Sequence, residues 1–335
     1  MKKALSVILI LCLAAGLCCC APKKAELSFG EDWLMNTYCS ITIYDAGREQ
    51  LISDAFSYAR DLENLLSRTV ETSDIYKFNA SGDGAECAPE TAEIVGIAKE
   101  YYELSGGVFD ISIGKVSKLW DFAAEDPKVP DAAKIEAAIE YTQNADKVYA
   151  KNGRLEKDIP EIEIDLGGIA KGYIADKTKQ FLTEQGVTTA VINFGGNIVL
   201  MGSKPDGSLW RVGIEQPFSG EEDLLIQDRS TVGTVETSEA SLVTSGTYER
   251  KFTAPDGTLY HHVLDPKTGY SVDTDLASAT IIGPESARCD ALSTSCLLLG
   301  SKKAQEFMKS INGYSYVFIK SDGEIINSIA YIDGR

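Results

Sequence analysis

The sequence lacks the motifs on which several large enzyme classes depend. It contains no Gly-x-x-x-x-Gly-Lys-[Ser/Thr] loop, no Gly-x-Gly-x-x-Gly turn opening a βαβ unit and no Gly-x-Ser-x-Gly elbow. These absences argue against the classical nucleotide-binding folds and against hydrolysis by a catalytic triad. Histidine is also scarce, because the 335 residues include only two, and these are adjacent. A site built from several histidines is therefore excluded.

The spacing of the cysteines gives no support to a zinc site. Beyond residue 20 the chain has Cys39, Cys87, Cys289 and Cys296, and none of them belongs to a CxxC pair. Isolated buried thiols are the simplest interpretation. One disulfide of unspecified pairing remains an alternative.

Positive charge is in short supply. The chain has 32 lysines and arginines against 50 aspartates and glutamates, which gives a formal net charge of −18 at pH 7. Residues 1–19 contain two lysines and no acid, so their removal takes the net charge to −20. Such an acidic surface argues against nucleic acid or anionic lipid as a partner.

The first nineteen residues differ from the rest of the chain. Lys2 and Lys3 precede the apolar run Ala4–Leu17, which is too short and wrongly flanked for a membrane-spanning helix. A basic start followed by a short apolar run is typical of a secretory signal peptide.

Three cysteines follow this run and resemble a bacterial lipobox. Leu17 lies three positions before Cys20, so we expect lipid attachment at Cys20, with Cys18 and Cys19 as alternatives. Diacylation would anchor the protein on the extracytoplasmic face of the cell membrane, facing the periplasm if an outer membrane is present. The expected organisation is a signal peptide over 1–19, a lipid-anchored tether over 20–30 and a folded domain over 31–335.

Hydrophobic periodicity predicts both helices and strands in that domain, with no internal repeat and no dividing linker. We expect strands near 40–44, 161–164, 187–193 and 260–264, and helices over 51–66, 90–104, 130–141, 173–185 and from just after Pro284. Residues 67–79 are expected to form a loop. The fold class is therefore mixed α/β (α+β), in a single domain.

A glycine-bearing turn, Asp165–Gly172, lies between a predicted strand and the next helix. Gly167 and Gly168 allow a ligand to approach the backbone closely, and the helix directs free N–H groups at the same point. Lys171 adds a positive charge. Such a turn suits a phosphate or a metal ion, and the alternative is a simple strand-to-helix connection.

A second polar set lies near the carboxyl end of the chain. Asp290, Ser293 and Thr294 stand at helical positions i, i+3 and i+4, so their oxygens share one face. One carboxylate with two hydroxyls is a hard-oxygen set that suits Mg²⁺ better than zinc. The alternative is a solvated helix face, although the apolar residues around Asp290 weaken it.

Three further features are candidates for a site. Asp110 lies in an apolar segment, where it either caps a turn or contacts a ligand, and capping is favoured. His261 and His262 would point to opposite faces of a strand, so only one of them can face a given site. Arg250, in a turn upstream, is available to an anion.

Five segments in this order resemble the ApbE family, the FAD:protein FMN transferases: DLGGIAKGYIAD, NFGGNI, SGTYER, HHVLDPKTG and DALSTSCLLLG. The resemblance runs from about Met35 to the end of the chain. It implies one ApbE-type domain that binds FAD and uses Mg²⁺. It also implies transfer of the FMN half of FAD to a threonine hydroxyl of a partner protein through a phosphoester bond, with release of AMP.

The resemblance implies roles for individual residues. Its flavin-nucleotide contacts fall on Met35, Thr69, Val108, Phe109, Asp110, Asp165, Lys171 and the backbone near Val263. Its metal ligands fall on the carbonyl of Gly168 and on Asp290, Ser293 and Thr294. His262 matches the active-site histidine and is the candidate base, a role that Asp290 could share through the metal. Thr69 stands where many members carry a tyrosine.

Two other functions would use the same residues. With water as the acceptor, the site would be an Mg²⁺-dependent FAD pyrophosphatase that yields FMN and AMP. Without catalysis, the protein would be an FAD-binding lipoprotein. The expected acceptor is a membrane-associated or secreted electron-transfer protein with a short Ser/Thr-rich motif, and this sequence does not identify it.

Overall fold

The computed structural model describes residues 27–122, 124–220 and 230–333, and its mixture of helices and strands confirms the predicted fold class. An eight-stranded sheet with the order β1-β2-β6-β7-β10-β13-β14-β15 forms the centre, and all neighbouring strands are antiparallel. The strands are β1 (Ser28–Leu34), β2 (Thr37–Ile43), β6 (Ala190–Phe194), β7 (Asn197–Met201), β10 (Ala240–Gly246), β13 (Leu276–Gly283), β14 (Ser315–Lys320) and β15 (Ile325–Asn327).

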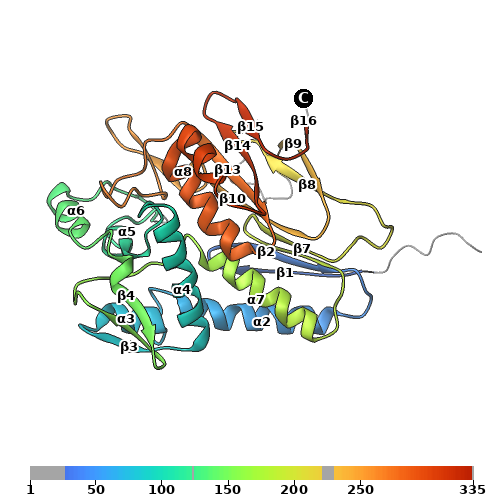
Figure 1. The fold of residues 1–335 in the computed structure, drawn as a ribbon, viewed down its shortest axis with the longest axis horizontal. Coiled ribbons are helices and arrows are strands. Elements are labelled where there is room, and N and C mark those ends of the chain that lie inside the picture. The colour runs from blue at the N-terminus through green and yellow to red at the C-terminus, as the bar shows by residue number, and fades with distance from the viewer. Residues whose placement is uncertain (1–26, 123, 221–229, 334–335) are drawn as a thin grey trace, which may run out of the picture.

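Long helices cover one face of this sheet. They are α2 (Glu49–Leu66), α7 (Ala170–Glu184) and α8 (Ser286–Met308), and α7 packs between the other two (Figure 1). Alternate side chains of β2, such as Ile41 and Ile43, are fully buried in the main core. The strand period of two thus supplies the apolar surface on which these helices pack.

A smaller antiparallel sheet covers part of the opposite face. Its strands are β8 (Trp210–Glu215), β9 (Thr231–Thr237) and β16 (Tyr331–Asp333). Trp210 and Val235 pack there against Leu242 and Val317 from the main sheet. The second core therefore lies over the middle and the carboxyl-terminal strands of the large sheet.

The chain between α2 and α7 forms a group of short elements, seen on the left of Figure 1. The helices there are α3 (Asp74–Ala80), α4 (Pro89–Leu104), α5 (Gly114–Ser117) and α6 (Ala132–Ile139), with single 3₁₀ turns at Ile111–Ile113 and Ala145–Lys147. The strands are β3 (Gly84–Glu86), β4 (Val148–Lys151) and β5 (Arg154–Lys157). A hairpin of β11 (Lys251–Thr253) and β12 (Leu259–His261) packs near them through Phe252 and Trp120.

The start of α8 is held by a carboxylate from α7. Asp176 accepts hydrogen bonds from the backbone N–H groups of Ser286 (2.9 Å) and Ala287 (2.8 Å). These donors have no partner within their own helix, so Asp176 acts as a cap supplied from outside. Burial raises the pKa of Asp176 to about 6. This contact fixes the position of α8 along α7.

The predicted loop over 67–79 is partly wrong, because α3 occupies its second half. Ser73 caps this helix, with its Oγ accepting a hydrogen bond from the N–H of Tyr76 at 2.9 Å. The helix has only seven residues, too short to show clear helical periodicity in the sequence.

Two predicted strands also need correction. Residues 161–164 form no strand: residue 161 lies in a turn and 162–164 are irregular, and the Asn79 side chain bonds both backbone groups of Ile164. The strand predicted over 260–264 is shorter, since β12 ends at His261. The other predicted strands and helices are confirmed with small shifts at their ends.

The cysteines that the structure describes are free thiols. Cys39, Cys289 and Cys296 are fully buried, and burial raises the pKa of Cys39 to about 12. The interpretation as isolated thiols is therefore confirmed. None of the helices within the described ranges combines the length and the apolar character that a bilayer crossing requires.

Candidate functional site

Asp290 lies at the centre of the candidate site, on the second turn of α8. Its side chain is buried, with 2% of the residue exposed, so the interpretation as part of a solvated helix face is wrong. Its Oδ2 accepts hydrogen bonds from the backbone N–H of Gly172 and from Nδ2 of Asn197, both at 2.9 Å. Its Oδ1 accepts no hydrogen bond from any residue that the structure describes. One carboxylate oxygen is therefore fixed and the other is left for a ligand.

Gly172 is required where α7 meets α8. A Cβ atom on Gly172 would lie 2.3 Å from the backbone carbonyl oxygen of Ser286. Only glycine lets the two helices come close enough for the Gly172 N–H to reach Asp290. The glycine in this part of the motif thus serves helix packing.

Asn197 connects Asp290 to Lys171. It is fully buried at the start of β7, donates to Asp290 through Nδ2, and accepts from Nζ of Lys171 at 3.1 Å through Oδ1. One amide therefore orients a carboxylate and a cation beside each other. The sequence analysis missed this role, although a polar residue directly after a Gly-Gly turn and inside a buried strand was the available signal.

Gly168, in the turn before α7, lies beside Thr294 of α8, as expected if both belong to one site. A Cβ atom on Gly168 would be 3.5 Å from Oγ1 of Thr294 and 3.1 Å from Cε2 of Phe109. The turn before α7 is therefore in contact range of the Thr294 hydroxyl. Ser293 differs, because its buried Oγ donates to the carbonyl of Asp290 (2.9 Å) and lies 2.7 Å from Oγ of Ser245.

Asp165 braces the same turn. Its Oδ2 contacts Nε of Arg68 at 3.0 Å and accepts from Oγ of Ser117 at 2.6 Å, and its Oδ1 accepts from the N–H of Gly167 at 2.8 Å. Thr69 is exposed beside Arg68. The loop after α2 is thereby tied to the turn that precedes α7.

Asp110 caps a turn, as favoured from the sequence. Its Oδ1 accepts from the N–H and the Oγ of Ser112 at 2.9 and 2.6 Å, and its Oδ2 accepts from the N–H of Gln143 at 2.5 Å. Burial raises the pKa of Asp110. Its carboxylate is engaged on both oxygens, which leaves half-buried Val108 and the backbone of this turn to meet a ligand.

Met35 lies in a backbone turn, and Val263 lies in an irregular segment just after β12. Met35 occupies the two-residue turn between β1 and β2 with a φ of 52°, and its N–H donates to Oε1 of Glu63 at 2.8 Å. Arg250 reaches the carbonyl of Met35 at 3.5 Å. Val263 is buried, and its carbonyl accepts from the N–H of Val272.

The two histidines differ in exposure, as expected, although β12 ends at His261 and His262 lies just beyond it. His261 is buried, whereas His262 is open to solvent. The N–H of His262 donates to the carbonyl of Arg250 at 3.0 Å. The protein surrounding the ring, and then the positive charges of Arg250 and Lys171, lower the pKa of His262 below its ordinary value. The lowered pKa favours a neutral His262 ring at pH 7, which makes it available as a proton acceptor.

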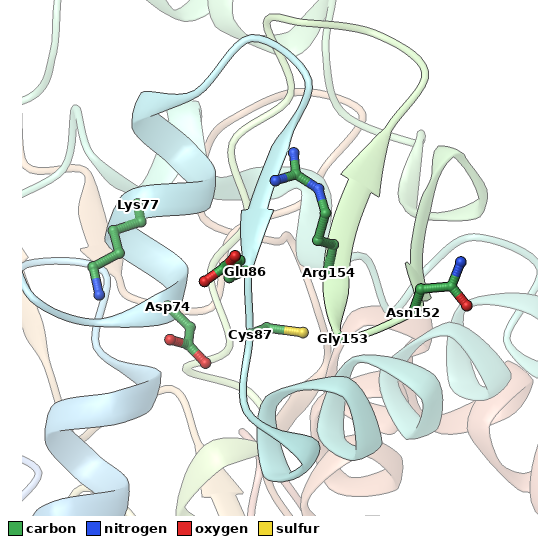
Figure 2. A pocket seen from close by; sticks show the side chains of 7 residues that line it. All are labelled: Asp74, Lys77, Glu86, Cys87, Asn152, Gly153 and Arg154. Carbon is green, nitrogen blue, oxygen red and sulfur yellow. The ribbon is translucent and has the colours of Figure 1, made fainter.

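A hollow on the described residues lies elsewhere, beside the β3–β5 sheet. It has a volume of about 710 Å³ and is drawn in Figure 2. Asp74 at its edge accepts hydrogen bonds from the N–H of Ala88 and the hydroxyl of Thr91. Its other charged residues are Lys77, Arg154 and Glu86, so the hollow has no single sign of charge. No predicted site residue lines it.

The fold and the site define a class of α+β protein in which one buried carboxylate, one lysine and a glycine turn meet where two helices cross over an antiparallel sheet. The chain belongs to the ApbE family, whose model matches residues 35–318. This match confirms the family resemblance.

Curated relatives and solved structures agree with this assignment. An FAD:protein FMN transferase of Klebsiella pneumoniae is 31% identical, over 84% of this chain and 85% of its own length. The enzyme of the same name from Treponema pallidum is 28% identical, over 97% and 93%. The structure of the ApbE protein from Thermotoga maritima superposes with a TM-score of 0.80 at 27% identity, covering 90% of this chain and 97% of that one. The flavin transferase ApbE from Vibrio cholerae gives 0.78 at 26% identity, covering 91% and 97%.

Proposed function

We propose that this protein transfers FMN from FAD to a threonine hydroxyl of an acceptor protein, with release of AMP. Two relatives that cover 97% and 84% of this chain are named FAD:protein FMN transferase, which supports the transfer of FMN from FAD to a protein. The observation that carries the proposal is the free Oδ1 of Asp290, held beside Lys171 by Asn197. A fixed carboxylate oxygen next to a cation suits a metal-bound diphosphate.

The donor set fits Mg²⁺. The described residues contain no group of three or more histidine, cysteine or acidic side chains able to hold a metal. A metal here would be held by Asp290, by the hydroxyl of Thr294 and by the carbonyl of Gly168, with Ser293 as a further candidate. Mg²⁺ commonly binds through one or two carboxylates together with substrate phosphates and water. When bound, it would neutralise charge on the diphosphate oxygens.

Lys171 and His262 have separate tasks in the transfer. Lys171, in the first turn of α7, stabilises the negative diphosphate together with the helix N-terminus. The threonine oxygen attacks the FMN-side phosphorus, the bond to the AMP oxygen breaks, and AMP leaves. A ring nitrogen of His262 takes the proton of the threonine hydroxyl, because the lowered pKa keeps the ring neutral.

The proposed location is the extracytoplasmic face of the cell membrane, facing the periplasm if an outer membrane is present. Lipid attachment at Cys20, with Cys18 and Cys19 as alternatives, lies outside the described residues and rests on the sequence pattern alone. Anchored there, the enzyme would meet an extracytoplasmic electron-transfer protein as acceptor. The signal peptide and the 20–30 tether remain predictions, as does the assignment of 31–335 as one FAD-binding domain.

The test is to incubate the protein with FAD and a threonine-bearing acceptor domain, with and without Mg²⁺, and to weigh the acceptor intact. A gain of one FMN less one water, dependent on Mg²⁺, is the expected result. AMP and free FMN without a gain in mass would identify the pyrophosphatase. Bound but unchanged FAD would identify a carrier, and either result contradicts the transferase.

A further inference from the structure

The edge strand β1 carries a row of exposed apolar side chains. Leu27, Phe29 and Trp33 are 51%, 51% and 61% exposed, and their spacing places them on one face of the strand. Ser28 and Leu34, on the other face, are buried. We call Leu27, Phe29 and Trp33 the β1 stripe. Exposed apolar groups that are this concentrated mark an interaction surface.

The second sheet leaves the β1 stripe uncovered. Its contacts with the large sheet involve Leu200, Leu242, Ile282 and Val317, which belong to β7, β10, β13 and β14. None of those strands is β1, which lies at the end of the sheet. Among the described residues, the second sheet therefore covers this face of the large sheet at its later strands but not at β1.

The acids beside the β1 stripe are already engaged. Glu31 lies between Phe29 and Trp33 on the same exposed face, and it accepts a hydrogen bond from the hydroxyl of Tyr38 at 2.7 Å. Asp32 pairs with Arg60 at 2.6 Å through Oδ2, and its Oδ1 accepts the N–H of Trp33 at 2.8 Å. Because that N–H would otherwise be free at the sheet edge, Asp32 blocks part of the edge against pairing with another strand. This favours an occupant that contacts side chains.

We propose that the β1 stripe docks on the lipid bilayer, an inference that rests on the proposed lipid anchor. Leu27 comes seven residues after Cys20. At about 3.3–3.6 Å per residue, such a tether holds the start of β1 within about 25 Å of the lipid. Tryptophan is enriched where proteins meet the membrane–water interface. The stripe nearest the anchor has the side chains that this interface accepts.

Docking through the β1 stripe is driven by apolar contact. The net charge of the chain without residues 1–19 is −20, which repels anionic headgroups. Docking is therefore expected on zwitterionic phosphatidylcholine vesicles and is expected to be insensitive to salt.

Docking would also orient the candidate site. β1 runs from the anchored end to the Met35 turn, about 24 Å at 3.4 Å for each of its seven residues. A strand lying along the bilayer keeps that turn near the membrane. The inference thus gives the proposed transferase a preferred orientation toward a membrane-associated acceptor.

Trp33 reports on the docking directly. The chain has three tryptophans, and the other two, Trp120 and Trp210, are 3% and 4% exposed. The experiment uses the full lipidated protein in vesicles of brominated phosphatidylcholine, with flotation to confirm attachment. Bromine should quench the Trp33 emission, and acrylamide access to Trp33 should fall several-fold. Trp33→Phe should remove the component that bromine quenches.

Paired substitutions separate docking from anchoring. Phe29→Glu should restore acrylamide access without preventing flotation, whereas Leu104→Glu, at a matched exposure of 49% on α4, should change nothing. FMN transfer to a soluble acceptor should be unchanged in both variants. A floating wild-type protein whose Trp33 stays fully open to acrylamide overturns docking and leaves the anchor standing. Failure to float overturns both. If Trp33 becomes protected from acrylamide only when the acceptor protein is added, the β1 stripe binds a protein and the proposal of bilayer docking is wrong.

Discussion

At the scale of single residues, the chemistry of Asp290 is decided by its neighbours. Gly172 and Asn197 bond one of its oxygens, so the side chain is fixed and the other oxygen is left available for a ligand. Fixing a carboxylate in this way lowers the cost of organising the site when substrate binds. Asn197 is therefore a positioning residue for both Asp290 and Lys171.

Substitution of Asn197 tests this positioning role. Asn197→Ala removes the acceptor of Lys171 and one of the two hydrogen bonds to Oδ2 of Asp290. We therefore expect kcat for FMN transfer to fall by about 10- to 100-fold, more than KM changes. Stability should fall by about 1–3 kcal/mol in urea unfolding. Asn193→Ala is the control, because Asn193 only holds the Gly196 N–H of the same hairpin. Equal kinetics in the two variants would contradict the role.

The pH dependence of transfer tests His262. The surrounding protein and the cations of Arg250 and Lys171 lower its pKa below the ordinary value of 6.5. A base must be neutral to act, so kcat/KM should persist below pH 6.5 and decline only at more acidic pH. The measurement is the pH profile of kcat/KM in the wild type and in His262→Gln, where the acidic limb should disappear. A wild-type midpoint above 6.5 would count against His262 as the base.

At the scale of secondary structure elements, the site depends on how closely α7 approaches α8. Gly172 allows the contact, and Asp176 caps α8 from α7. Each of these contacts joins the motif that continues into the first turns of α7 to the motif on α8. Two segments more than one hundred residues apart thus form one rigid unit.

Gly172→Ala should separate the two helices. The added Cβ would lie 2.3 Å from a backbone oxygen, and overpacking of this kind costs about 1–3 kcal/mol. Gly96→Ala is the matched control. Gly96 is an exposed position of α4, and a Cβ there meets nothing within 4 Å. That change should stabilise by about 0.5–1 kcal/mol. Urea unfolding of both variants checks the opposite signs, and two effects of the same sign would refute the packing argument.

Asp176 should make stability depend on pH. Its pKa is raised by burial from 3.8 to about 6, so its stabilising contribution is complete below pH 3.8 and is lost as pH rises through about 6. A shift of about two units corresponds to about 3 kcal/mol. The free energy of unfolding of the wild type, relative to Asp176→Asn, should fall by up to that amount across this range. A pH-independent difference would disprove the shift.

At the scale of the whole molecule, the sequence predicted the elements that have strong periodicity and missed those that depend on long-range partners. The helices over 51–66 and 90–104 repeat their apolar residues at helical spacing and are confirmed as α2 and α4. The run over 161–164 has strand-like alternation in its sequence, yet it forms no strand, and its backbone bonds the Asn79 side chain and the distant N–H of Gly114. No local pattern reveals such a partner.

The candidate site shows the same division. The resemblance to the ApbE family implied that Asp290, Gly168 and Thr294 share one site, and the structure places Gly168 beside Thr294 and Gly172 beside Asp290. The bridging role of Asn197 needed β7 to lie beside both helices, which is a property of the assembled sheet. The burial of Asp290, and hence its unshared oxygen, likewise appears only after folding.

The measurement that tests the central claim most directly is the initial rate of FMN transfer as Mg²⁺ is titrated, in the wild type and in Asp290→Asn. The amide keeps the size of the side chain and removes the negative charge, and urea unfolding of both proteins confirms that the fold is kept. We predict a rate at least about 100-fold lower in the variant at every Mg²⁺ concentration. Equal rates with the same Mg²⁺ dependence would contradict the assignment of Asp290 as the centre of the site.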